Sequence, residues 1–471
     1  MIITCTTVAI NYLLGPSIMK WMSICCLIFV ASWGVVCCID NYATNQSLTH
    51  GMSSASGRDM APVVFVPGFM GTRLYANVTD DIYMPTSCKD ENVSVGVPFA
   101  IMFNVSLDLT ATSCVFELLT LVFDPSAEEF VDQPGIVIFT QNFGGFSDIS
   151  PVYWAFANTL VQKWTTEGPS GGGGEAVYAL GRNLFGAPYD YRFMSVGALR
   201  RTGFVRELVC LVERAFVLNN GTRVVLVGHS NGGPTLYSFL RDSNLVSASW
   251  KDKYIAAFIP LSGNLLGQMN AIKPFLYNTA HSFEGQLMLC SWEGTFGSTA
   301  WGGYTENQSS GPVVTTFLGS PQETNYTTSL EDMGRLFATI GRDDWTQQLA
   351  SVTRQVMNRS AHPGVDVVCL FGTDVSTEFS YGFAAGINDY SSNQPHSLPV
   401  IVRSMGGDGN QDIVDNEFCL QWADDNDVGT QGFRFDSEGF PGVHHMEMYN
   451  DDAVMSRLYS TIWTYSYNQK D

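Results

Sequence analysis

Short runs of apolar residues alternate along the chain with longer stretches in which apolar positions recur every three or four residues. The runs predict strands that are buried on both faces, as in parallel sheets, at 62–66, 135–139, 223–227, 254–261, 365–372 and 398–402. The periodic stretches predict amphipathic helices at 152–164, 203–217, 234–247 and 451–466. Strands that alternate with helices indicate an α/β fold with a mostly parallel central sheet.

Two long stretches interrupt this alternation, at 76–130 and 265–360. Segments of this length inside a compact domain are usually functional, as lids or binding loops. A chain of 471 residues suits one large α/β domain that carries insertions. We therefore expect a single domain over 60–470 with these two stretches inserted into it.

One short motif carries the chemistry. Residues Gly228–Gly232 read G-H-S-N-G, directly after a predicted strand and before a predicted helix. A G-x-S-x-G sequence in this context forms a strained turn that projects the serine oxygen above the sheet. There the start of the helix and nearby backbone N–H groups assist attack on a carbonyl group. The motif predicts Ser230 as a nucleophile.

A serine nucleophile needs a base, and the base needs an acid that orients it. In folds with this motif the chain order is serine, acid, histidine. His444 and His445 lie after the last predicted strand and before the last helix, where the base is expected. Asp374, Asp408 and Asp412 compete for the role of the acid, whereas His229, beside the serine, is expected only to pack.

Six motifs in order make the chain resemble the lecithin:cholesterol acyltransferase and lysosomal phospholipase A family. They are VVFVPGFMGTRL at 63–74, APYDYR at 187–192, VGHSNGG at 227–233, PGVDVVCLFG at 363–372, GDGNQDIVDNEFCLQW at 407–422 and HHMEM at 444–448. The resemblance implies an α/β-hydrolase fold, His445 as the base and Asp408 as the acid. The family continues its G-D-G turn with Thr-Val, where this chain has Asn410-Gln411, so Asp412 and then Asp374 stay as alternatives.

An oxyanion hole needs two N–H donors where negative charge develops. The residue after the nucleophile, here Asn231, supplies one of them. The resemblance places the second at Phe69. The chain departs from the family at Asn231, where an apolar residue is common, and at 262–267, where SGNLLG replaces an Ala-Pro and a tryptophan.

The resemblance also implies two disulfides. Cys88 and Cys114 would bracket a membrane-binding loop within 76–130, and Cys369 would pair with Cys419. Inside that loop the run VPFAIMF at 97–103 offers apolar area for a lipid surface, with a buried strand as the alternative. Cys210 is expected to be a buried thiol on a helix face, and Cys290 stays unassigned. The stretch 265–360 is expected to form a cap and lid.

Composition and the N-terminus bear on location. The net charge of −21 argues against nucleic acid as a partner. An uncharged segment at 21–38 follows Lys20, so we expect a cleaved signal peptide within 1–40, with an uncleaved signal anchor as the alternative. N-glycosylation sequons fit a secreted protein or one in a lysosomal or other endomembrane lumen. They occur at Asn45, Asn77, Asn92, Asn104, Asn220, Asn307, Asn325 and Asn358.

These observations together predict a monomeric, secreted or lumenal glycoprotein that needs no metal or cofactor and works at a membrane or lipoprotein surface. By resemblance it would take an acyl group from a phospholipid donor and pass it to a lipid alcohol acceptor, such as a sterol, or to water. Two alternatives stay open: an esterase or lipase for neutral lipids, and a catalytically silent lipid-binding glycoprotein.

Overall fold

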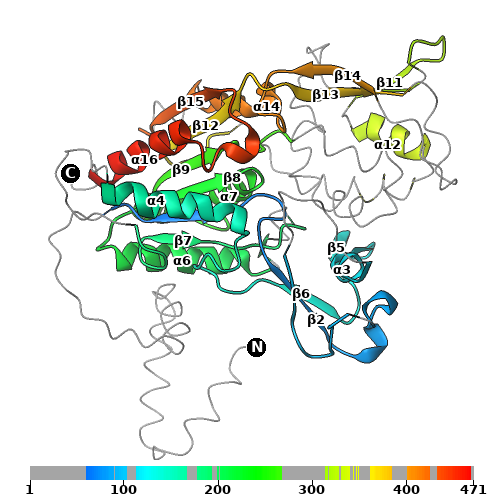
Figure 1. Cartoon of the computed structure of the whole chain (residues 1–471), viewed down its shortest axis with the longest axis horizontal. Coiled ribbons are helices and arrows are strands. Elements are labelled where there is room, and N and C mark those ends of the chain that lie inside the picture. The colour runs from blue at the N-terminus through cyan, green and yellow to red at the C-terminus, as the bar shows by residue number, and fades with distance from the viewer. Residues whose placement is uncertain are drawn as a thin grey trace, which may run out of the picture. The chain divides into compact units, whose positions relative to one another are not determined.

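A parallel sheet of six strands forms the centre of the protein, in the order β15-β12-β9-β8-β1-β7 (Figure 1). The computed structural model describes residues 60–89, 91–102, 113–166, 178–193, 199–200, 202–267, 313–316, 318–327, 330–339, 343, 346, 348, 361–383, 400–424 and 432–467. The strands are β1 (Val63–Val66), β7 (Leu184–Gly186), β8 (Val224–His229), β9 (Ile255–Leu261), β12 (Val367–Thr373) and β15 (Phe435–Pro441). Each neighbouring pair runs parallel, which confirms the predicted fold class. The expected signal segment lies outside the described residues.

Helices cover both faces of this sheet (Figure 1). On one face α4 (Trp154–Thr166) and α16 (Asp452–Tyr467) pack with Val225 and Val227 of β8. On the other face α6 (Phe204–Leu218), α7 (Gly232–Arg241) and α8 (Ala248–Tyr254) pack with Val224 and Leu226. Successive strand residues point to opposite faces, so a strand between two helical layers must be apolar throughout. This explains why apolar runs predicted β1, β8, β9 and β12.

Three predictions of elements need correction. The helix expected at 234–247 is too long: α7 ends at Arg241, the carboxylate of Asp242 accepts from the backbone N–H of Asn244 in a local turn, and α8 begins only at Ala248. The predicted strand at 135–139 is β6 (Ile136–Phe139), which lies in a separate antiparallel sheet. The predicted strand at 398–402 is β14 (Val400–Met405), which also lies outside the central sheet.

The stretch after β1 contains a small antiparallel sheet, β3-β2-β6, with β2 (Leu74–Val78) between β3 (Phe99–Ile101) and β6. A hairpin of β4 (Leu121–Asp124) and β5 (Glu129–Asp132) follows α3 (Ser113–Leu119). Two 3₁₀ helices, Asp81–Tyr83 and Thr86–Cys88, lie between β2 and β3. We call residues 74–139 the first insertion.

Arg192, in the loop after β7, ties the first insertion to the central domain. Its fully buried guanidinium group bonds Asp190 at 2.6 Å, Asp132 of β5 at 2.7 Å and the carbonyl oxygen of Leu119 at 3.1 Å. A buried guanidinium group is stable only with such a set of acceptors, because each missing acceptor leaves charge without solvation. Burial lowers the pKa of Arg192, but the carboxylates of Asp190 and Asp132 together outweigh burial and raise this pKa above its usual value.

A second small sheet has the order β11-β10-β13-β14, with β10 (Val313–Thr316), β11 (Thr324–Thr327) and β13 (Thr377–Gly382) beside β14. α12 (Leu330–Thr339) follows β11. The sheet thus joins strands from the stretch expected to be the cap with two strands from beyond residue 360. Much of that stretch, including 268–312, lies outside the described residues.

The remaining described elements are short. They are α14 (Ile413–Asn416) and 3₁₀ helices at Pro151–Tyr153, Phe418–Asp424 and His445–Glu447. None of the helices in the described ranges combines the length and the apolar character needed to cross a bilayer.

Disulfides join Cys88 to Cys114 and Cys369 to Cys419, the two pairings that the resemblance implied. The first closes a loop of the first insertion, and the second links β12 to the 3₁₀ helix Phe418–Asp424. Cys210 is also disulfide-bonded, so the expectation of a free thiol there was wrong.

Candidate active site

Ser230 stands directly after β8, at the turn into α7. Its backbone φ angle is 53°, in the left-handed region that non-glycine residues rarely adopt. The turn is tight: a Cβ atom on Gly228 would lie 2.6 Å from the backbone of Gly232, and one on Gly232 would collide with the carbonyl oxygen of Val66. The N–H of Ser230 donates to the carbonyl oxygen of Leu261, at the end of β9. The turn is therefore held from both neighbouring strands.

His445 and Asp408 form a buried pair. His445 Nδ1 lies 2.8 Å from Asp408 Oδ2, and the His445 N–H donates to the Asp408 carbonyl oxygen at 2.8 Å. The other carboxylate oxygen of Asp408 accepts from the N–H groups of Asn410 and Gln411, at 3.0 and 2.7 Å. Backbone and side chain together thus fix how the imidazole ring of His445 is turned.

The charge of Asp408 is stabilised where it lies. Burial by itself raises the pKa of this carboxyl group. The charge and the hydrogen bond of His445, with the two backbone N–H donors, outweigh burial and hold the pKa below its usual value of 3.8. Asp408 therefore stays ionised at neutral pH and accepts a hydrogen bond from His445 Nδ1–H.

The alternative residues lie elsewhere. His444 is exposed and begins the 3₁₀ helix that contains His445. The carboxylate of Asp412 caps α14, where it accepts from the N–H groups of Val414 and Asp415. The exposed Asp374 bonds the hydroxyl of Thr373 at 3.2 Å. Of the residues that compete for acid and base, the structure brings together Asp408 and His445.

His229 connects this pair to the serine. It precedes Ser230, and its Nε2 atom lies 3.0 Å from the carbonyl oxygen of His445. The centres of the two imidazole rings are 4.8 Å apart. Ser230, His445 and Asp408 therefore meet in one neighbourhood, where β8 and β15 end and where β14 leads into the Asp408 turn.

The two residues expected to donate to an oxyanion lie in two segments near the serine. Asn231 directly follows Ser230 and precedes α7, and Phe69 directly follows Gly68 in the loop after β1. Gly68 lies so close to Ser230 that a Cβ atom on it would be 2.9 Å from the serine Cβ. The ring of Phe69 packs against that of Tyr191, with 5.4 Å between ring centres. The loop after β1 and the turn into α7 thus converge at Ser230.

A pair of buried amides, which the sequence did not reveal, supports this arrangement. Asn264 Nδ2 donates to Asn231 Oδ1 at 2.6 Å, and the N–H of Asn264 donates to the carbonyl oxygen of Ser230 at 3.2 Å. Both positions departed from the family motifs in the sequence, but only the fold shows that they touch. The amide pair fixes the peptide whose N–H is expected to face the oxyanion.

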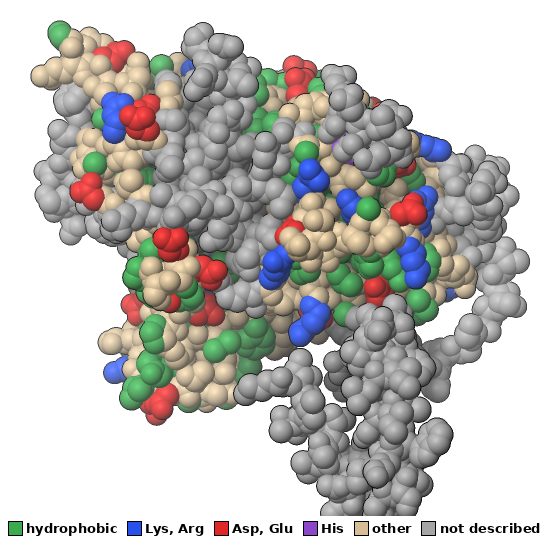
Figure 2. Space-filling view, turned by 180° about the vertical axis from the view of Figure 1, so that it is seen from behind, with side chains coloured by type: hydrophobic (Ala, Val, Ile, Leu, Met, Phe, Trp, Pro, Cys, Tyr) green, Lys and Arg blue, Asp and Glu red, His purple; other side chains and the backbone are tan. Residues whose placement is uncertain are grey.

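Exposed apolar side chains gather on the first insertion. Ile82 is 77% exposed and Val97 is 57% exposed, and Tyr83 and Val95 are also exposed. The turn at 94–97 lies beside β2, since the N–H of Gly96 donates to the carbonyl oxygen of Val78. Figure 2 shows hydrophobic side chains on this part of the molecule, at the lower left. We call Ile82, Tyr83, Val95 and Val97 the apolar edge.

The run at 97–103 was expected to be either exposed or a buried strand, and it combines both. It contains β3, in which Phe99 is half-buried, Ala100 is exposed and Ile101 is buried. Val97, just before the strand, contributes the exposed part. Residues 103–112, which follow, lie outside the described residues.

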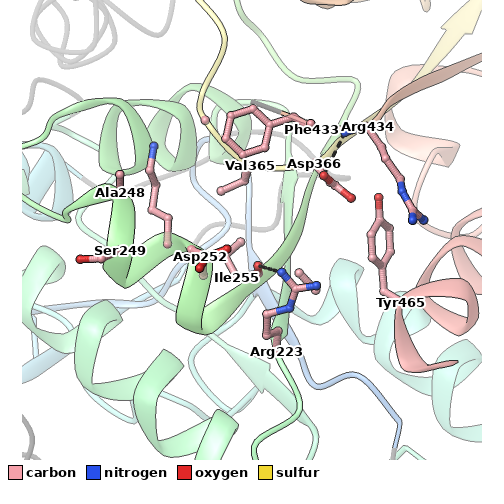
Figure 3. Close-up of a pocket in the computed structure, with 14 residues that line it drawn as sticks. Arg223, Ala248, Ser249, Asp252, Ile255, Val365, Asp366, Phe433, Arg434 and Tyr465 are labelled. Atoms are coloured by element: carbon pink, nitrogen blue, oxygen red, sulfur yellow. Dashed lines mark hydrogen bonds between the residues drawn. The ribbon is translucent and has the colours of Figure 1, made fainter. Parts of the chain in front are cut away.

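A cavity of about 560 Å³ lies away from Ser230, His445 and Asp408 (Figure 3). Its lining includes Arg223, Ile255, Asp366 and Arg434, which stand at or just before the first residues of β8, β9, β12 and β15. Parallel strands begin at one edge of a sheet and end at the other, and Ser230 and His445 follow strand ends. The cavity is therefore no part of the candidate active site.

Four of the expected glycosylation sites fall on described residues. Asn92, Asn220 and Asn325 are exposed, while Asn77 is half-buried in β2. The others, Asn45, Asn104, Asn307 and Asn358, lie outside the described residues. Among the described side chains no group of three or more His, Cys, Asp or Glu residues is arranged to hold a metal ion.

Comparisons with known proteins show that the chain is similar to one family. The family model described as lecithin:cholesterol acyltransferase matches residues 99–288. Lecithin-cholesterol acyltransferase-like 1 of Oryza sativa subsp. japonica is 27% identical over 435 residues, which cover 86% of this chain and 87% of that protein. Phosphatidylcholine-sterol acyltransferase of Mus musculus is 24% identical and covers 77% of both chains. Lysosomal phospholipase A and acyltransferase of Homo sapiens is 27% identical and covers 84% of this chain and 89% of its own. The resemblance drawn from the motifs is confirmed.

Proposed function

We propose that this chain, which carries a lecithin:cholesterol acyltransferase domain, takes an acyl group from a phospholipid onto Ser230 and passes it to a lipid alcohol or to water. One observation carries the proposal. A buried histidine, bonded at 2.8 Å to an ionised and buried aspartate, lies beside a serine held in a strained turn. This combination is what acyl transfer through a serine requires.

The chemistry follows from the three side chains. His445 takes the proton of the Ser230 hydroxyl as the serine oxygen bonds the ester carbon, and Asp408 stabilises the imidazolium ion that forms. The lysophospholipid oxygen then leaves with that proton, so the acyl group is bonded to Ser230. An acceptor hydroxyl repeats these steps in reverse, and His445 again takes and returns the proton.

The backbone N–H groups of Asn231 and Phe69 are proposed to stabilise the oxyanion. They belong to a helix start and to the loop after β1, and both loops are held against Ser230. Fixed donors need no reorganisation when the negative charge develops, and each such donor is typically worth about 3–4 kcal/mol in the transition state.

A lipid surface is the proposed place of action. The apolar edge exposes Ile82 and Val97 on the first insertion, and the relatives named above are acyltransferases of phosphatidylcholine or phospholipases. Exposed apolar side chains lower their free energy when they enter the bilayer interface. We propose that the first insertion docks the enzyme on a membrane or lipoprotein, so that single lipids reach Ser230.

The proposed location is a lumen or the outside of the cell. Disulfides such as Cys88–Cys114 persist in oxidising compartments, and Asn92 and Asn220 are exposed sequons. One of the relatives is named as lysosomal.

The acceptor decides whether the reaction is transfer or hydrolysis, because both pass through the same acyl-enzyme. We propose that a lipid alcohol of the sterol type competes with water for it. The name of one relative couples phosphatidylcholine to a sterol, and the name of another joins phospholipase A to acyltransferase.

The test is to incubate the purified protein with phosphatidylcholine vesicles, with and without a sterol or a long-chain alcohol. Lysophospholipid should be released in both cases, and the acceptor should divert the acyl chain from free fatty acid to a new ester. Hydrolysis of soluble short-chain esters alone would favour the neutral esterase. A protein whose serine does not react with a fluorophosphonate probe would be the catalytically silent lipid-binding glycoprotein.

A further inference from the structure

A buried series of hydrogen bonds connects the loop after β1 with the backbone of His445. We call this loop, which contains Gly68 and Phe69, the oxyanion loop. The N–H of Gly68 lies 3.1 Å from the hydroxyl oxygen of Tyr153, which lies 3.0 Å from Nδ1 of His229. Nε2 of the same ring lies 3.0 Å from the carbonyl oxygen of His445. Tyr153 and His229 are fully buried or nearly so.

The donor and the acceptor of every hydrogen bond in this series are determined. A carbonyl oxygen only accepts, so His229 Nε2 carries the hydrogen and donates it to His445. Nδ1 of the neutral ring is then an acceptor, and the Tyr153 hydroxyl donates to it. The tyrosine oxygen in turn accepts from Gly68 N–H. Each group therefore has its partner, and no second arrangement satisfies all of them.

The side chains of His229 and Tyr153 lie on the same face of the central sheet. His229 continues the row of Val225 and Val227 in β8, so its ring points toward the layer of α4 and α16. Tyr153 stands just before α4, and Tyr449 stands shortly before α16. The Tyr449 ring lies 5.3 Å from the His229 ring and 4.8 Å from the Tyr153 ring, between ring centres.

Burial keeps His229 neutral and keeps the Tyr153 hydroxyl group protonated. Loss of solvation, followed by the nearby charge of His445, lowers the pKa of His229 to about 3. The groups that face its ring are Tyr153, Tyr449, His445 and, more distantly, Asp408. Burial also raises the pKa of Tyr153 and of Tyr449, so both hydroxyl groups keep their protons.

We propose that Tyr153 and His229 are positioning residues, which hold the oxyanion loop and His445 at a fixed separation around Ser230. This inference rests on the proposed function. One end of the hydrogen-bond series is Gly68, whose neighbour Phe69 is the proposed oxyanion donor. The other end is the backbone of His445, which Asp408 holds through its N–H and His229 through its carbonyl oxygen. The base is thus fixed from two sides.

Gly68 lies so close to Ser230 that a small shift of the oxyanion loop would change the distance between them. A Cβ atom on Gly68 would lie 2.8 Å from the Tyr153 hydroxyl and 2.9 Å from the Ser230 Cβ. If the tyrosine oxygen is removed, the oxyanion loop loses the hydrogen bond from Gly68 N–H to Tyr153, which holds the loop close to Ser230. Misplacement of a reacting group by about 1 Å can cost on the order of 100-fold in rate.

Two comparisons test the proposal. Tyr153→Phe removes one buried hydroxyl, and Tyr178→Phe removes another, equally buried hydroxyl that bonds the Ala61 carbonyl oxygen before β1. The second pair is His229→Gln and His229→Asn. Glutamine carries an N–H group near the position of Nε2 and keeps the bond to His445, whereas asparagine reaches only the position of Nδ1.

The readouts are kcat and KM for a soluble ester, the rate at which a fluorophosphonate labels Ser230, and thermal unfolding. We expect Tyr153→Phe to lower kcat and the labelling rate about tenfold without a change in KM, and Tyr178→Phe to lower them less than about twofold. His229→Asn should lose about 100-fold, and His229→Gln should recover most of that loss.

Equal labelling rates in the two tyrosine variants would overturn the proposal, as would losses in the two His229 variants that follow only their unfolding temperatures. If the His229 variants do not fold, the tyrosine pair decides alone. Labelling needs no natural substrate, so a labelled wild type that releases no lysophospholipid would refute the proposed function and leave this inference open to the same test.

Discussion

Ser230 occupies a backbone conformation that serine avoids when nothing enforces it. The left-handed φ of 53° costs on the order of 1–3 kcal/mol, which the surrounding contacts must offset. Those contacts are the bond to Leu261, the close approach of Gly232 to β1 and the bond from Asn264. Because the strain lifts the serine oxygen out of the sheet beside the helix start, it belongs to the proposed mechanism.

Two substitutions test whether Asp408 or Asp412 is the catalytic acid. Asp408→Asn should lower kcat about 10²–10⁴-fold, because an amide in place of the carboxylate no longer stabilises the His445 imidazolium ion or its correct tautomer. Asp412→Asn should leave kcat nearly unchanged, since asparagine caps a helix as well as aspartate does. Steady-state rates on phosphatidylcholine vesicles measure both effects. Near-normal activity of Asp408→Asn together with an inactive Asp412→Asn would reverse the assignment.

The sequence identified the candidate nucleophile more readily than the residues that surround it. Ser230 lies in a local turn, so nearby residues suffice to identify it. Asp374, Asp408 and Asp412 all lie in turns, and only the path of the chain between β14 and α14 decides which carboxylate reaches His445. Tyr153 and Asn264 lie in no motif, and His229 stands at a position of the serine motif that any residue can fill. The partners of all three are distant in sequence, so no sequence pattern indicated these bonds. His229 was expected to pack, and it does, but its two ring nitrogens each have a defined bond.

Strands were predictable where a run of at least four residues is buried on both faces; β7, buried at all three of its positions, was too short to be predicted. β8 and β9 are buried at every position, and their apolar runs were sufficient signal. β15 escaped prediction because it lies at the edge of the sheet, where FDSEGFP has exposed residues throughout and one buried residue, Phe440. β14 was predicted as a strand, but an apolar run does not reveal which sheet a strand joins.

The apolar edge of the first insertion can be tested against a matched residue elsewhere. Val97→Asp should reduce the vesicle-bound fraction and the activity on vesicles about tenfold, because roughly 1.5 kcal/mol of burial is lost. Activity on a soluble ester should not change. Val217→Asp is the control, since Val217 is 62% exposed on α6 and Val97 is 57% exposed. Vesicle sedimentation with parallel rate measurements gives both quantities.

If Val97→Asp and Val217→Asp behave alike on vesicles, the apolar edge has no special part in docking. If Val97→Asp also lowers the rate on the soluble ester, the effect lies in the active site or the fold and not at the lipid surface.

The stability of the whole protein should depend on pH through His229. The folded state holds this imidazole neutral, with a pKa of about 3, whereas the unfolded chain binds a proton below about 6.5. Between these values the unfolded state binds more protons, so the free energy of unfolding falls as pH falls. The slope due to His229 approaches about 1.4 kcal/mol per pH unit.

His229→Gln removes this titration, so its unfolding free energy should fall less steeply than that of the wild type between pH 6 and about 4. Urea unfolding at a series of pH values measures the two slopes, and a general loss of stability in the variant does not affect the comparison. Parallel slopes would show that His229 is not held neutral by the fold.

In the proposed reaction, Ser230 carries the acyl group from a phospholipid. The most direct measurement is the rate of lysophospholipid release from phosphatidylcholine vesicles by the wild type and by Ser230→Ala, with both proteins shown to be folded and vesicle-bound. We expect a loss of about 10³–10⁶-fold in the variant. Release by Ser230→Ala at a rate near that of the wild type would contradict this role of Ser230.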